Sequence, residues 1–118
     1  MVLGHVSSTL ASGCGDSPGK ILRAMRLLEH AGYPPTIGQF DLAAADGAKP
    51  RIYILKAKPT CWRVYFGIDG QGRRFLYALA ICKQQQKRKQ SDTDKARRRF
   101  EEALAGDRPI QRITFPAR

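Results

Sequence analysis

The stretch from Trp62 to Cys82, W-R-V-Y-F-G-I-D-G-Q-G-R-R-F-L-Y-A-L-A-I-C, predicts a β-hairpin around which the chain is organised. Its two apolar arms flank Asp69–Gly72, a segment whose residues tolerate the positive φ of a tight reversal. In the first arm apolar residues alternate with residues that include Arg63 and Tyr65, which predicts one apolar face and one polar face. The second arm, Phe75–Cys82, is apolar throughout, as is typical of a central strand covered on both faces.

The positive charge of the chain is concentrated in its C-terminal half. The 118 residues have the length of one domain and carry a net charge of +11. Residues 1–50 hold four Lys/Arg and four Asp/Glu, whereas residues 51–118 hold 17 and 6. A basic half beside a neutral half favours a polyanionic partner such as nucleic acid. The alternative is a surface whose charge serves solubility.

The cysteines and the hydropathy pattern predict a cytoplasmic protein without membrane contact. Cys14, Cys61 and Cys82 are odd in number and form no C-x-x-C pair, which favours free thiols in a reducing cytosol. The N-terminus has no basic segment followed by a long apolar one, so no signal peptide is expected. No apolar stretch approaches the roughly 20 residues that span a bilayer.

Two helices are predicted outside the hairpin. Ser17-Pro18 is typical of a helix start, and apolar residues then recur at helical spacing, which predicts a helix over about 17–32. Ser91 as N-cap and Asp94 in capping-box position predict a second helix over about 92–105, ended by Gly106.

The remaining segments complete an α+β fold. Residues 51–58 alternate as a strand that ends at Pro59, and residues 33–50 are predicted as a loop with one short turn. Residues 1–15 and 107–118 are expected to be peripheral, each with an edge strand as one alternative. The expected single domain, 1–118, is a small twisted antiparallel sheet of 3–4 strands with an N-terminal and a C-terminal helix.

Several of these segments, in this order, resemble the RelE/HigB superfamily of bacterial and phage toxins. They are L-K-A-K at 55–58, W-R-V-Y-F at 62–66, a glycine turn, an apolar strand that ends in a Lys-rich segment, and D-K-A-R-R-R-F-E-E-A-L at 94–104. The resemblance covers about residues 20–105. It implies the toxin of a type II toxin–antitoxin pair, which cleaves mRNA in the ribosomal A site. The implied partners are mRNA, the ribosome and a cognate antitoxin of helix-turn-helix or acidic type.

The side chains allow RNA cleavage without a metal or other cofactor. The sequence shows no carboxylate pair, Cys/His dyad or metal-ligand cluster, and His5 and His30 lie in the neutral half, where a structural or solvated role is expected. RNA carries its own nucleophile, because its 2′-hydroxyl attacks the adjacent phosphorus. Clustered Lys and Arg can stabilise the charge that develops on the phosphate and exchange the protons.

The candidate catalytic residues lie on two neighbouring predicted strands. Lys56 and Lys58 are two residues apart and therefore share a face, as do Arg63 and Tyr65, and the short connection between the strands lets all four converge. The resemblance implies basic catalytic residues at Lys56, Lys58 and Arg63, and an RNA-binding segment made of Lys83, Lys87, Arg88 and Lys89. The fork of Arg63 suits a phosphate clamp, and Lys56 or Lys58 is the candidate for proton transfer. The alternative for each Lys is a solvated strand face.

Relatives often carry a Tyr or His before the last helix, but residues 84–94 contain neither, which leaves Tyr65 or Tyr53 as substitutes. Trp62 is expected in the core.

Two other functions remain open: a non-catalytic RNA- or ribosome-binding module that uses residues 83–99 as its basic surface, and a phage-derived protein of the same fold that inhibits a host protein. A neighbouring reading frame for a small acidic or helix-turn-helix protein would favour the toxin.

Overall fold

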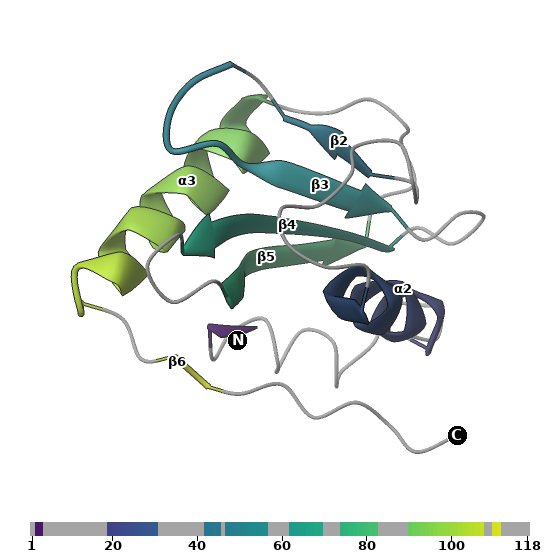
Figure 1. The fold of residues 1–118 in the computed structure, drawn as a ribbon. Coiled ribbons are helices and arrows are strands. Elements are labelled where there is room, and N and C mark those ends of the chain that lie inside the picture. Colours follow the sequence, from purple (N-terminus) through teal and green to yellow (C-terminus); the bar gives the residue numbers. More distant parts are fainter. Residues whose placement is uncertain are drawn as a thin grey trace.

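The predicted hairpin lies at the centre of a six-stranded sheet (Figure 1). The computed structural model describes residues 2–3, 19–30, 42–45, 47–56, 62–69, 74–82, 90–107 and 110–111. β4 (Trp62–Asp69) and β5 (Arg74–Cys82) are antiparallel, with Asp69 opposite Arg74. Nη2 of Arg74 donates to Oδ2 of Asp69 at 2.8 Å, so an ion pair closes the turn end of the hairpin.

Four antiparallel strands form the main part of the sheet, which confirms the predicted fold class. β3 (Tyr53–Lys56) pairs with β4, and β2 (Leu42–Ala44) pairs with β3. β2 lies within the segment predicted as a loop; three residues are too few to show a strand period in the sequence. β1 (Val2–Leu3) is parallel to β5 and has β6 (Ile110–Gln111) on its other side, so β1 is internal rather than an edge strand.

The two helices lie on opposite faces of this sheet (Figure 1). A Cβ atom added to Gly67 of β4 would come within 2.5 Å of the Phe100 ring, so α3 (Gln90–Leu104) packs on the face that Gly67 shares with Arg63 and Tyr65. The neighbouring Phe66 belongs to the other face, where it lies opposite Tyr77.

The second helix, α2 (Gly19–His30), covers the face that carries Phe66 and Tyr77. The hydroxyl of Tyr77 donates to Oε2 of Glu29 in α2 at 3.2 Å. The buried side of α2 is Ile21, Met25 and Leu28, as its apolar spacing predicts. The predicted start at Ser17-Pro18 lies outside the described residues.

The C-terminal end of α3 lies just before Gly106, as predicted, whereas the predicted first residue of the helix is wrong. The helix begins at Gln90, so Ser91 lies inside it instead of capping it, and Asp94 accepts a hydrogen bond from Nε2 of Gln90 at 3.0 Å. At the other end Gly106 has φ of 86° and donates its N–H to the Ala103 carbonyl. The next N–H, of Asp107, reaches the Glu102 carbonyl at 2.9 Å, which completes a Schellman motif.

Because each face of the sheet carries a helix, β4 is buried on both sides from Trp62 to Gly67. Trp62 is in the core, as predicted. The face of β4 predicted as polar, which carries Arg63 and Tyr65, is covered as well. In the described part of the chain, no helix has the length and apolar character needed to cross a membrane.

Candidate nucleic-acid interface

The register of the sheet brings two predicted catalytic residues directly opposite each other. Lys56 of β3 pairs with Arg63 of β4, and Tyr65 follows on the same face, opposite Ile54. The predicted convergence of Lys56, Arg63 and Tyr65 is therefore confirmed at the level of strand pairing. Like charges directly opposite each other repel, so this pair concentrates positive potential at one end of the sheet.

The Lys-rich segment follows directly in the sequence after the strand that ends here. Cys82, the last residue of β5, pairs with Trp62, which is the neighbour of Arg63. Lys83 is bonded to Cys82, and its Cα is therefore about 3.8 Å from that of Cys82. We call this region, where β3 ends, β4 begins and β5 ends, the Lys56 end of the sheet. Lys58 follows Lys56 by two residues in the sequence.

The candidate residues at the Lys56 end differ in burial. Arg63 is 4% exposed and Tyr65 is fully buried, whereas Lys56 is half-buried. Arg63 lies on the face of β4 opposite Trp62 and Val64, as predicted, but this face is also covered, so its side chain is buried. Its role in phosphate binding stays a prediction. Of the described residues at this end, Lys56 is the cation best placed for contact with a partner.

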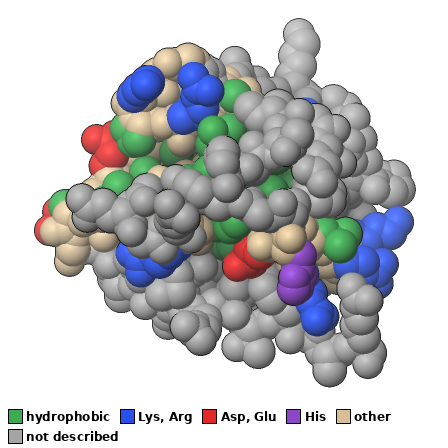
Figure 2. Space-filling view, in the orientation of Figure 1, with side chains coloured by type: hydrophobic (Ala, Val, Ile, Leu, Met, Phe, Trp, Pro, Cys, Tyr) green, Lys and Arg blue, Asp and Glu red, His purple; other side chains and the backbone are tan. Residues whose placement is uncertain are grey.

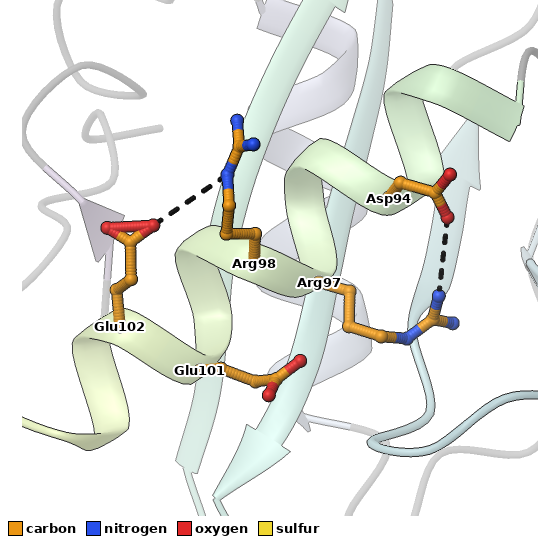
Figure 3. Close-up of a pocket in the computed structure, with 5 residues that line it drawn as sticks. All are labelled: Asp94, Arg97, Arg98, Glu101 and Glu102. Carbon is orange, nitrogen blue, oxygen red and sulfur yellow. Dashed lines mark ion pairs between the residues drawn. The ribbon is translucent and has the colours of Figure 1, made fainter.

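Arg97 and Arg98 of α3 interact with their own helix and with a neighbouring loop. Nε of Arg97 donates to the Pro50 carbonyl at 3.0 Å, and its Nη1 lies 3.7 Å from Asp94 (Figure 3). Nε of Arg98 lies 3.8 Å from Glu102. The helix as a whole carries four acidic and four basic residues. The helical part of the predicted basic surface, residues 90–99, carries four basic and two acidic residues, and Glu101 and Glu102 make the complete helix neutral.

Of the other predicted residues, Tyr53 and His30 are described by the structure and the rest are not. Tyr53, a proposed substitute for the missing aromatic, stacks on Phe66 with ring centroids 5.4 Å apart and belongs to an aromatic cluster. His30 is exposed on α2. The remaining candidates lie outside the described residues: Lys58, Lys83, Lys87, Arg88, Lys89 and His5.

A buried Tyr–Glu pair on the opposite face was missed by the sequence analysis. Burial raises the pKa of Tyr77 well above its ordinary value, and the charge of Glu29 and the hydrogen bond to it add to the rise. The phenol therefore stays protonated and ties α2 to β5. The signal in the sequence was a hydroxyl group within an otherwise apolar central strand.

Among the described residues, no group of three His, Cys, Asp or Glu side chains is arranged to hold a metal ion. Comparison of the chain with protein-family models, with curated proteins and with solved structures finds no match.

Proposed function

We propose that this protein binds RNA through the Lys56 end of the sheet. The observation that carries the proposal is the strand register: Lys56 opposite Arg63, with the Lys-rich segment attached to the adjacent Cys82. Phosphates would draw their binding energy from this concentration of cations, and no metal is needed for such contacts. The net charge of +11 supports the same class of partner.

The proposal is tested by titrating the protein into a fluorescently labelled single-stranded RNA between 50 and 200 mM salt. We expect the affinity to fall steeply with salt, because bound cations release counterions from the RNA. Lys56→Ala should weaken binding and reduce the slope of log K against log salt by about 0.7, the contribution of one phosphate contact. Lys49→Ala, an exposed lysine before β3, is the matched control. Salt-independent affinity, or equal effects of the two variants, would contradict the proposal.

A second candidate function is metal-independent cleavage of mRNA by a toxin of the RelE/HigB type. The observation that favours it is that Lys56, Arg63 and Tyr65 share one face. In such a reaction the 2′-oxygen loses its proton and bonds to phosphorus, and the 5′-oxygen leaves and takes up a proton. Lys56 would exchange protons near the phosphate, and the buried Arg63 opposite Lys56 would contribute positive potential at the site.

Cleavage is tested by incubating RNA with the protein, with and without ribosomes, and mapping the new ends. A 2′,3′-cyclic phosphate that forms equally in EDTA is the expected product, and Lys56→Ala should slow its formation. Induction of the chain in cells should stop growth, and an antitoxin encoded next to it should restore growth. Binding without any new RNA ends in these assays would leave the first function and reject the second.

A further inference from the structure

The outer face of α2 is a row of basic side chains. At about 100° per residue, Lys20, Arg23, Leu27 and His30 fall within an arc of about 80°, and Arg26 extends that arc to about 120°. The centre of the arc is nearly opposite the buried side of the helix. Lys20, Arg23, Leu27 and His30 are exposed, and Arg26 is half-buried. We call these five residues the α2 face.

The charges of this face are not neutralised by the rest of the described structure. The one acidic residue of α2, Glu29, accepts the hydrogen bond from Tyr77 and lies off the arc. No carboxylate among the described residues forms an ion pair with Lys20, Arg23 or Arg26. In α3, by contrast, Arg97 and Arg98 face Asp94 and Glu102 (Figure 3). The helix in the neutral half of the sequence is therefore the cationic one.

The position of α2 links this face to the Lys56 end of the sheet. α2 contacts β3 and β4. Figure 1 shows α2 near the end of the sheet toward which the β3 arrow points, and Lys56 is the last residue of β3. In Figure 2, Lys and Arg side chains gather beside the histidine in the area of α2. Because Lys56 and Arg63 share the face that α3 covers, α2 lies on the opposite face of the sheet. A strand of RNA held at the Lys56 end would reach this helix by passing around that end of the sheet.

We propose that the α2 face is a second phosphate-binding surface for RNA, in a role that rests on the RNA binding proposed above. Three cations in a row match a polyanionic strand, and two of them are arginines, whose planar forks suit phosphate. A protein partner is disfavoured because interface centres are rich in apolar and aromatic residues, whereas this face exposes one large apolar side chain, Leu27, at 42%.

The first experiment compares two exposed lysines within the wild-type protein. Lys20 of α2 and Lys95 of α3 are acetylated with a limiting reagent, with and without saturating single-stranded RNA, and each rate is read by mass spectrometry. RNA should slow the labelling of Lys20 several-fold and leave Lys95 unchanged. Equal labelling of Lys20 with and without bound RNA would overturn the inference.

The second experiment compares two variants that lose the same charge. In Lys20→Ala/Arg23→Ala/Arg26→Ala, three phosphate contacts are removed, so the salt slope should fall by about 2. Between 50 and 200 mM salt, this variant should therefore lose about 20-fold less affinity than the wild type. The control is Lys49→Ala/Lys95→Ala/Arg98→Ala, from other exposed sites. Circular dichroism shows whether each variant is folded.

The outcomes separate this inference from the proposed function. If the wild type binds RNA but both triple variants change the slope equally, the α2 face is not a specific contact and the RNA function stands. If the wild type does not bind RNA, both proposals fail. If poly-glutamate protects Lys20 where RNA does not, and Leu27→Ser abolishes that protection, the face takes an acidic protein and the inference is wrong.

Discussion

Gly67→Ala tests the contact that places α3 on the sheet. The added methyl would lie 2.5, 2.6 and 2.7 Å from three ring atoms of Phe100, far inside van der Waals distance. Phe100 is 1% exposed, so its ring has little space into which to move. Overpacking of this kind costs about 1–3 kcal/mol. Loss of glycine's freedom in the unfolded chain offsets about 0.5–1 kcal/mol of that.

The net expectation is a destabilisation of about 1–2 kcal/mol. For 118 residues the unfolding entropy makes each kcal/mol worth about 4 °C, so Tm should fall by about 4–8 °C in calorimetry or thermal circular dichroism. Gly47→Ala is the matched control, because a Cβ there meets nothing within 4 Å. It should change stability by less than about 0.5 kcal/mol, or stabilise the protein slightly.

A double variant identifies the ring as the cause. Phe100→Leu alone leaves a cavity and is destabilising, but it removes ring atoms that the new methyl would meet. Gly67→Ala/Phe100→Leu should therefore be more stable than the sum of the single changes predicts, by at least about 0.5 kcal/mol. Strict additivity, or a Gly67→Ala protein as stable as Gly47→Ala, would refute the packing of α3 against β4 at this point.

Two further predictions follow from burial. Arg63→Ala should lower stability by about 2 kcal/mol, since removal of a buried side chain leaves a cavity and the groups that interact with it lose their partner. Thermal melts should show Lys56→Ala close to wild type, and an Arg63→Ala protein with unchanged Tm would contradict the burial of this side chain. The raised pKa of Tyr77 means that its phenol stays protonated in the folded state after the unfolded chain has lost the proton. Its contribution is therefore complete below about pH 10 and is lost as pH rises above that value. In urea titrations at pH 9 to 11, Tyr77→Phe should lose less stability per pH unit than wild type, and parallel slopes would exclude the effect.

The elements that could be predicted from the sequence are those with a long periodic pattern. The hairpin arms, the apolar side of α2 and the glycine end of α3 are local features, and the structure has them within about two residues. β2 could not be predicted in this way, because Leu42–Ala44 has too few residues to show a period. Its partner strand, which lies later in the chain, stabilises it.

The burial of Arg63 shows a different limit. Alternation along β4 correctly assigns Arg63, Tyr65 and Gly67 to one face, but it does not say whether that face meets solvent. Gly67 was the available signal, since a glycine within a strand often marks the close approach of another element. A second helix on that face turns a strand with one apparent polar side into one buried on both sides.

The charge of the chain illustrates the same limit at the scale of the molecule. When basic and acidic residues are counted in each half of the sequence, the whole net charge of +11 belongs to residues 51–118, and residues 1–50 have no net charge. Yet α3, which contains the run of three arginines in the basic half, is neutral overall, while α2 in the neutral half carries three basic residues and one acidic residue. The excess of the basic half therefore lies outside α3. Arg97 and Arg98, two residues of the most conspicuous basic motif, are thus poor candidates for phosphate binding, because Asp94 and Glu102 of the same helix lie 3.7 and 3.8 Å from them.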